Sequence, residues 1–200
     1  MFDTRAVAIF KPLVDVLARR LKQWGIGANA LTVSGFLMGL SAAACIVFSQ
    51  FWLAICLLLL GRLLDALDGA VARLGSATDK GGYLDITLDF LFYAAIPLAF
   101  AWNNPQVNAL AAATLLAAFM GTASSFLAFA VIAEKQQLKS VVYPNKSFYF
   151  LGGLTEATET IVAFVAMCIW PQYFAAIAFG FAGLCAVTIG MRVWHGWQVL

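Results

Sequence analysis

Four aspartates gather in a stretch of the chain that is otherwise rich in apolar residues. Asp65 and Asp68 are three positions apart, which places both side chains on one face of a helix. Asp85 and Asp89 are four positions apart, with the same consequence for a second helix. A carboxylate inside a membrane costs about 2.5–3.5 kcal/mol, and several together repel one another unless cations neutralise them. Because the ligands are carboxylate oxygens without His or Cys, the pattern predicts a Mg²⁺ or Mn²⁺ site at a membrane surface.

The residues next to the aspartates are suited to phosphate. Gly69 and Ala72 are small residues three positions apart, so a ligand or another helix can approach the backbone closely. Arg73 follows at once, and its planar guanidinium matches phosphate oxygens. Gly81 begins the next apolar run, where free backbone N–H groups and the helix dipole favour an anion. Together with two metal ions, which promote displacement at phosphorus, these features predict a bound diphosphate.

The composition is that of a membrane protein. Of the 200 residues, 63% are hydrophobic, and the mean hydropathy is +0.89. A membrane-spanning helix needs about 20 apolar residues, and six runs come near this length. They cover approximately Leu31–Gln50, Phe51–Arg73, Gly82–Trp102, Val107–Ala133, Leu151–Trp170 and Tyr173–Val193. We therefore predict an all-α integral membrane protein, with one domain over residues 1–200 and a six-helix bundle over residues 31–193.

The positive charges predict the orientation of this bundle. All 12 Lys and Arg residues can be placed on one side, including Arg62, Arg73 and Lys80 around the connection between the second and third runs. The connections on the other side, around residues 49–52, 103–108 and 171–173, carry no charged residue. Since cytoplasmic loops carry the excess of Lys and Arg, both termini and the aspartates are expected on the cytoplasmic side.

The first 24 residues form a separate amphipathic segment without the pattern of a cleavable signal peptide. Apolar residues recur at spacings of three and four, with basic residues between them, which predicts a helix lying in the membrane interface. The alternative is a soluble cap over the bundle. The four cysteines all fall within the apolar runs and give no reason to expect a disulfide.

The aspartate region resembles the signature of the CDP-alcohol phosphotransferase family. Eight positions carry the residue types of that signature in the same order: Asp65, Asp68, Gly69, Ala72, Arg73, Gly81, Asp85 and Asp89. The spacer between the arginine and the glycine has seven residues, where the family usually has eight. The leading amphipathic helix, the six runs and the tract that follows Lys146 are also similar to a bacterial inner-membrane branch of the family.

This resemblance implies a reaction in phospholipid biosynthesis. A phosphatidyl group would pass from CDP-diacylglycerol to an alcohol, with release of CMP. By resemblance Asp65, Asp68 and Asp85 hold two Mg²⁺ or Mn²⁺ ions, while Asp89 shares in coordination and acts as the general base. The residues expected to bind the cytidine diphosphate are Asp65, Gly69, Ala72 and Arg73, with Thr32 and Thr78 as weaker candidates. Family resemblance also implies a homodimer.

The sequence leaves several alcohols as candidate acceptors. Glycerol 3-phosphate is the first choice, because bacterial membranes need phosphatidylglycerol and a basic loop with Lys135, Lys139 and Lys146 could meet its phosphate. Serine, inositol or its phosphate, or another head group are alternatives. Glu156 and Glu159 could position the acceptor, or could instead pair with basic residues to orient helices.

An ion-coupled transporter is the alternative from another class, because acidic residues inside membranes can relay protons. Transporters usually place their sites near the middle of the membrane, in helices related by internal repeats. Here the acids cluster at one end of the runs and no repeat is evident, which favours the enzyme. Nothing in the sequence indicates nucleic-acid binding.

Overall fold

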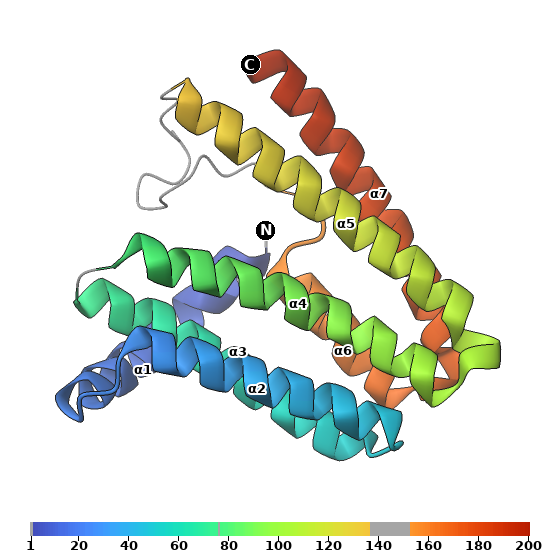
Figure 1. Cartoon of the computed structure of the whole chain (residues 1–200), viewed down its shortest axis with the longest axis horizontal. Coiled ribbons are helices and arrows are strands. Elements are labelled where there is room, and N and C mark those ends of the chain that lie inside the picture. Colours follow the sequence, from blue (N-terminus) through green and yellow to red (C-terminus); the bar gives the residue numbers. More distant parts are fainter. Residues whose placement is uncertain (1, 76, 137–152) are drawn as a thin grey trace.

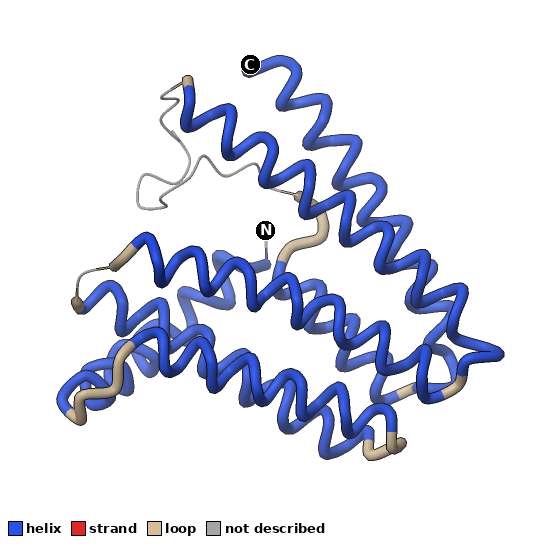
Figure 2. Tube along the Cα trace, in the orientation of Figure 1, coloured by secondary structure: helices blue, strands red, loops and turns tan. Residues whose placement is uncertain are grey.

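The computed structural model describes residues 2–75, 77–136 and 153–200, with side chains from residue 11 onward. Within these ranges every regular element is a helix (Figure 2). The elements are α1 Phe2–Gln23, α2 Ala28–Val47, α3 Phe51–Leu74, α4 Asp79–Asn103, α5 Pro105–Lys135, α6 Ala157–Ile169, the 3₁₀ turn η1 Pro171–Tyr173, and α7 Phe174–Val199. Lys139 and Lys146 of the predicted basic loop lie outside the described residues.

Helices α2 to α7 occupy the six predicted runs, and their arrangement has two parts (Figure 1). Helix α2 packs against α3 and α4, while α5 and α7 form a second closely packed pair. Buried aromatic rings join these parts at the end far from the aspartates. The rings of Phe100 in α4 and Phe174 in α7 stack with centroids 4.4 Å apart, and both side chains are fully buried.

Two glycines bring α2 and α3 into direct backbone contact. A Cβ added at Gly35 would lie 3.0 Å from the carbonyl oxygen of Gly61, and one added at Gly61 would lie 3.0 Å from that of Gly35. Small residues permit such close helix packing in membranes. Gly61 lies one turn before Asp65, so this contact sets the position of α3 directly beside the predicted site.

Four of the described helical segments are long and apolar enough to cross a membrane: α2, α4, α5 and the segment Pro171–Val199. Helix α3 has the required length but carries Arg62 at its midpoint and Asp65, Asp68 and Arg73 in its second half. Helix α6 has only 13 residues, shorter than the predicted run, because it begins at Ala157. The structure is thus an all-helical membrane fold, and a count of six spans stays a prediction.

Helix α1 packs against the aspartate end of the bundle. Its buried Ala18 joins an apolar cluster with Leu31 of α2 and with Leu67 and Val71 of α3. The Lys22 ammonium at its end donates to the carbonyl of Leu74, the last residue of α3. A cation at this place also interacts favourably with the negative end of the α3 helix dipole. Helix α1 therefore helps hold the carboxyl end of α3, and its place in a membrane interface stays a prediction.

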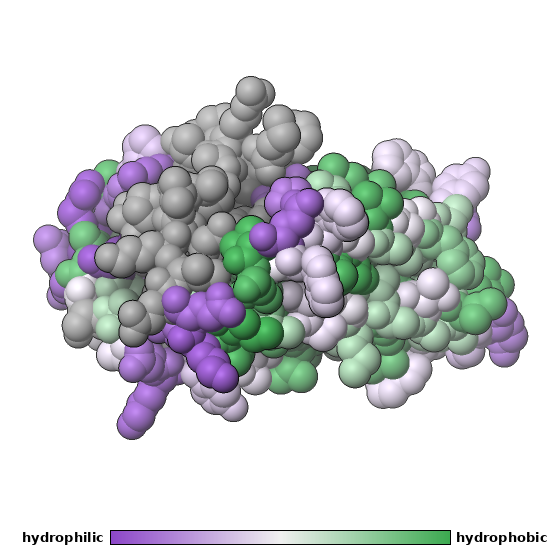
Figure 3. Space-filling model, turned by 90° about the horizontal axis from the view of Figure 1, so that it is seen from above, coloured by the Kyte–Doolittle hydropathy of each residue, from purple (hydrophilic) through white to green (hydrophobic). Residues whose placement is uncertain are grey.

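Hydropathy divides the surface along the long axis of the molecule. In the face shown in Figure 3, hydrophilic residues gather at the end where α3 ends and α4 begins. Apolar and weakly polar residues cover much of the remaining length, with a smaller polar group at the opposite tip. This distribution suits a protein whose apolar section lies in lipid and whose aspartates lie near one membrane surface.

Candidate active site

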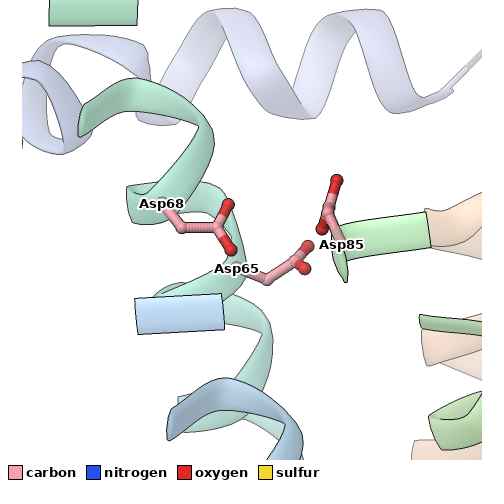
Figure 4. Close-up of side chains that lie close together, drawn as sticks. All are labelled: Asp65, Asp68 and Asp85. Carbon is pink, nitrogen blue, oxygen red and sulfur yellow. The ribbon is translucent and has the colours of Figure 1, made fainter. Parts of the chain in front are cut away.

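Three of the four aspartates converge between α3 and α4, which both pack against α2. The carboxylates of Asp65 and Asp68 from α3 and Asp85 from α4 point toward one another (Figure 4). One oxygen from each lies within 4.8 Å of the others. Asp68 is buried, and its Oδ2 has no hydrogen-bond partner among the described residues.

A divalent cation fits this group of carboxylates. Buried polar atoms normally have partners, so the unpartnered oxygen of Asp68 needs one. Three convergent carboxylate oxygens also supply the negative charge and the hard ligands that Mg²⁺ and Mn²⁺ prefer. The donor atoms therefore suit the metal predicted from the sequence.

Asp89, one turn further along α4, has a different partner. Its Oδ1 accepts a hydrogen bond of 2.7 Å from Nη1 of Arg62, and the same nitrogen lies 3.5 Å from Oδ2 of Asp65. Asp89 also lines a small pocket with Asp65 and Asp85. The fourth carboxylate is thus adjacent to the other three, and Arg62 forms the link between the two helices.

Arg62 is held in place by aromatic rings as well as by carboxylates. Its guanidinium carbon lies 4.3 Å from the centre of the Phe92 ring and 6.0 Å from that of Tyr93. Only 15% of its side chain is exposed. The sequence suggested Arg62 as a cytoplasmic charge and as one possible partner of Glu156 and Glu159. The spacing of three positions to Asp65 was the available signal for a contact.

The predicted nucleotide residues Gly69, Ala72 and Arg73 follow the aspartates in α3, and Thr78 directly precedes α4. Gly69 is half-buried, and a Cβ there would lie 3.3 Å from Nη1 of Arg73. Ala72 is also half-buried, whereas Arg73 and Thr78 are exposed. The Thr78 hydroxyl accepts a hydrogen bond from the Gly81 N–H and caps α4, so it has a structural role of its own.

Gly81 and Thr32 complete this region. A Cβ at Gly81 would lie 3.0 Å from Oδ1 of Asn29 and 3.2 Å from Oγ1 of Thr78, so these two side chains would have to shift slightly to admit it. Thr32 is buried beside Asp65 in the small pocket, and its hydroxyl donates to the carbonyl of Ala28. The short spacer therefore still brings the start of α4 against the start of α2.

A cavity of about 450 Å³ lies on the other side of Asp89. It is lined by residues of α4, α5 and α7 and by the start of α6. Its charged lining residues are Asp89, Glu156 and Arg192. Sequence reasoning named Glu156 but gave no pattern that would predict the cavity.

Glu156 and Glu159 cap the first turn of α6. The Glu156 carboxylate accepts from the backbone N–H of Glu159, and Oε2 of Glu159 accepts from the backbone N–H of Glu156 at 3.1 Å. This reciprocal pair explains why α6 begins at Ala157. Arg62, one of the suggested partners of these glutamates, instead contacts Asp65 and Asp89.

The sequence of this chain matches a known family profile over residues 26–193, that of CDP-alcohol phosphatidyltransferase. The chain belongs to the CDP-alcohol phosphatidyltransferase family. Members of this family are CDP-alcohol phosphotransferases, so the resemblance drawn from the aspartate signature is confirmed. Membership also argues against the ion-coupled transporter.

Relatives of this chain include synthases of two different lipids. The inner membrane protein YnjF of Escherichia coli is 48% identical over 200 residues, which cover 100% of this chain and 97% of YnjF. The archaetidylinositol phosphate synthase of Pyrococcus horikoshii is 40% identical over 87 residues, 43% of this chain and 46% of that protein. The phosphatidylcholine synthase of Pseudomonas aeruginosa is 32% identical over 89 residues, 42% of this chain and 37% of that protein.

Solved structures share the phosphatidyltransferase fold over nearly the whole chain. The phosphatidylinositol phosphate synthase PgsA1 of Mycobacterium tuberculosis with CDP-DAG bound has a TM-score of 0.74 and 20% identity, covering 93% of this chain and 94% of that one. PgsA1 in complex with manganese and citrate has a TM-score of 0.71 and 21% identity, covering 92% and 88%. At these identities the likeness shows the fold alone.

Proposed function

We propose that this protein transfers a phosphatidyl group from CDP-diacylglycerol to an alcohol and releases CMP. The observation that carries the proposal is the convergence of Asp65, Asp68 and Asp85 within 4.8 Å, inside the family signature. The PgsA1 structure with CDP-DAG bound supports the choice of donor. The reaction belongs to phospholipid biosynthesis, in a bacterial inner membrane, with the site and both termini on the cytoplasmic side.

In this proposal the three convergent aspartates hold Mg²⁺ or Mn²⁺, and Asp89 completes the set for two ions. The manganese-bound PgsA1 structure and the unpartnered oxygen of Asp68 support this. When bound, the metal charge stabilises the negative charge on the diphosphate and on the CMP leaving group. The aspartates would hold the metal charge near the carboxyl end of α3 and the amino end of α4, next to the exposed residues predicted to bind the nucleotide.

The nucleotide half of the donor would lie over the end of α3. Gly69 and Ala72 leave the helix backbone open to close approach, and Arg73 is placed to donate to phosphate oxygens. Asp65 contacts the nucleotide as well as the metal, and Thr78 supplies a polar group at the start of α4. The exposure of Arg73 supports this role, because its guanidinium is accessible to a ligand.

Asp89 serves as the general base. It takes the proton from the acceptor hydroxyl while that oxygen attacks the β-phosphorus of the donor, and the bond from phosphorus to the CMP oxygen breaks. Arg62 holds the Asp89 carboxylate through the hydrogen bond of 2.7 Å. The position of Asp89 between the other aspartates and the cavity supports this assignment, since the acceptor can reach the base from the cavity side.

The remaining predictions concern the whole molecule. We infer that residues 1–200 form one membrane domain with six spans, α2 to α7, and that it works as a homodimer. Helix α3 would cross with its charged second half at the cytoplasmic surface. Glycerol 3-phosphate as the acceptor stays a prediction from the frequency of that reaction in bacteria.

The experiment is CMP release from CDP-diacylglycerol by the purified protein in lipid nanodiscs, with Mg²⁺ or Mn²⁺ and a panel of alcohols. We expect activity that disappears in Asp85→Asn, because one carboxylate of the metal group is lost. Asp79→Asn is the matched control, since Asp79 is an exposed aspartate at the start of the same helix. No CDP-diacylglycerol binding by folded protein with metal would contradict the proposal.

A further inference from the structure

The last turn of α3 carries Ala72 and Arg73, which are predicted to bind the donor. Carbonyl groups in the last turn of a helix have no donor within that helix. Here the Ala72 carbonyl accepts from the Gly75 N–H at 3.1 Å, and the Leu74 carbonyl accepts from the Lys22 ammonium of α1. A Cβ added at Gly75 would lie 4.0 Å from Nζ of Lys22, so the ammonium lies directly beside the helix end. A side chain of α1 thus completes the end of α3.

Apolar packing holds α1 against the same part of α3. Ala18 lies four positions before Lys22, on the same face of α1, and is fully buried. It belongs to an apolar cluster with Leu67 and Val71 of α3. Each of these two residues directly precedes a residue predicted to bind metal or nucleotide. Helix α1 therefore supports both turns of α3 that carry the predicted donor site, and Lys22 is its contact with the last one.

The turn after α1 fixes the place of Lys22. The Gly25 N–H donates to the Lys22 carbonyl and the Ile26 N–H donates to the Leu21 carbonyl, both at 3.0 Å. These two bonds form the Schellman pattern of a helix end, and Gly25 has the positive φ of 77° that the pattern requires. The turn leads into α2, whose Asn29 lies beside the start of α4. The end of α1 and the start of α2 therefore contact the two helix ends between which the donor is proposed to bind.

Arg73 depends on this support because its own side chain is exposed. A Cβ at Gly69 would lie 3.3 Å from its Nη1, so the guanidinium reaches back over the face of α3 expected to receive the diphosphate. Arg73 forms no side-chain hydrogen bond or ion pair with another residue that the structure describes. The position of its guanidinium therefore follows the backbone of residues 72–75, which Lys22 and the Gly75 N–H hold in place.

We propose that Lys22 is a positioning residue for the donor. Through the Leu74 carbonyl it holds the last turn of α3, and it thereby keeps Arg73 over Gly69 for the diphosphate. The inference rests on the proposed phosphatidyl transfer and gives α1 a role in donor binding. Lys22 acts through the backbone of α3 and does not touch the donor. A lysine that bound the diphosphate directly would behave differently, because its contribution would add to that of Arg73.

The test measures CDP-diacylglycerol binding in nanodiscs with Mn²⁺, together with kcat and KM for CMP release. Lys22→Met should raise the Kd and KM of the donor about fivefold or more, because a hydrogen bond from a charged group is lost, while kcat stays within about twofold. Lys22→Arg should recover most of the affinity. Lys11→Met is the matched control, since Lys11 is an exposed lysine of the same helix. Unchanged donor affinity in Lys22→Met, an equal loss in Lys11→Met, or a loss confined to kcat would overturn the proposal.

A double variant shows whether Lys22 acts through Arg73. Once Arg73→Met has removed the guanidinium, adding Lys22→Met should weaken donor binding by no more than about twofold. Equal losses with and without Arg73 would mean that Lys22 contacts the diphosphate itself, and would refute the positioning role. Binding of Mn²⁺ alone should stay within about twofold in Lys22→Met, because the aspartates lie before the last turn of α3. Weaker Mn²⁺ binding would indicate a general disturbance of α3 and would also refute the proposal.

Hydrogen exchange on the unaltered protein covers the case in which Lys22→Met does not fold. We expect the amides of residues 72–75 to be protected before the donor is added, and CDP-diacylglycerol with Mn²⁺ to slow their exchange by no more than about twofold. Fast exchange that becomes slow only with the donor would show that the donor orders this turn, and would overturn the proposal. Failure of the unaltered protein to bind CDP-diacylglycerol with Mn²⁺ would instead overturn the proposed function.

Discussion

Replacing Arg62 should separate the placement of Asp89 from the binding of the donor. Arg62→Met keeps a long side chain over Phe92 but removes the charge and the hydrogen bond of 2.7 Å to Asp89. Arg62→Lys keeps the charge but loses the planar guanidinium, whose Nη1 contacts both Asp65 and Asp89. The two variants therefore remove different parts of the same contact.

The magnitude follows from the geometry of this contact. A hydrogen bond to a charged group contributes about 1.5–3 kcal/mol. Arg62 and Asp89 are 15% and 30% exposed, so solvent screens the pair only in part. If half or more of this energy serves to orient Asp89, the loss in kcat is about 3- to 140-fold, since about 1.4 kcal/mol corresponds to a factor of ten. The KM for CDP-diacylglycerol should change little, because Arg62 lies on the inner side of the aspartates.

The assay is CMP release at saturating donor, with kcat and KM measured separately. Lys80→Met is the control, because Lys80 is an exposed cation at the start of α4 and its loss changes the net charge equally. We expect Arg62→Lys to recover part of the kcat lost in Arg62→Met. An unchanged kcat in folded Arg62→Met, or a change in KM alone, would refute the idea that Arg62 orients the base.

Three further predictions concern the site and its support. Asp89→Asn should lower turnover by about 10²- to 10⁴-fold, the usual contribution of general-base catalysis, with CDP-diacylglycerol affinity within twofold; normal turnover would exclude Asp89 as the base. EDTA should stop CMP release and Mg²⁺ or Mn²⁺ should restore it, whereas activity that resists EDTA would argue against the metal site. Gly81→Ala should leave the fold about 1 kcal/mol less stable in thermal unfolding than Gly82→Ala does, because its Cβ would press on Asn29 and Thr78. Gly82→Ala has nothing within 4 Å and should be neutral or slightly stabilising, so equal effects of the two substitutions would contradict this explanation.

Much of the helical organisation was predictable because apolar runs of membrane length carry a strong signal. Helices α2, α3, α4, α5 and α7 lie within a few residues of the predicted runs, except that α7 continues to Val199. The predicted first residue was wrong for one helix: α6 was predicted to begin at Leu151, and it begins at Ala157. Apolar content alone does not reveal a helix start. The capping pair Glu156 and Glu159 does, but the sequence suggested that these residues position an acceptor or pair with basic residues to orient helices.

The site was predictable where spacing along one helix decides the geometry. The convergence of Asp65, Asp68 and Asp85 followed from helical spacing and a short connection between two antiparallel helices. The contact between Arg62 and Asp89 depends on how far α4 is rotated about its axis, which packing of Phe92 and its neighbours decides. The cavity likewise depends on the divergence of α4 and α5, to which no local pattern corresponds.

The close approach of Gly35 and Gly61 bears on how the protein is made. Helices α2, α3 and α4 are consecutive, and residues 28–103 alone contain every aspartate of the site. The contact between Gly35 and Gly61 needs only the hairpin formed by α2 and α3. The part of the protein that carries the aspartates can therefore assemble before α5 to α7 have been synthesised. Arg62, which contacts Asp65 from within the same helix, then offsets part of the charge of that carboxylate before Asp85 is in place. The second half of the chain would add the cavity to a site that has already been built.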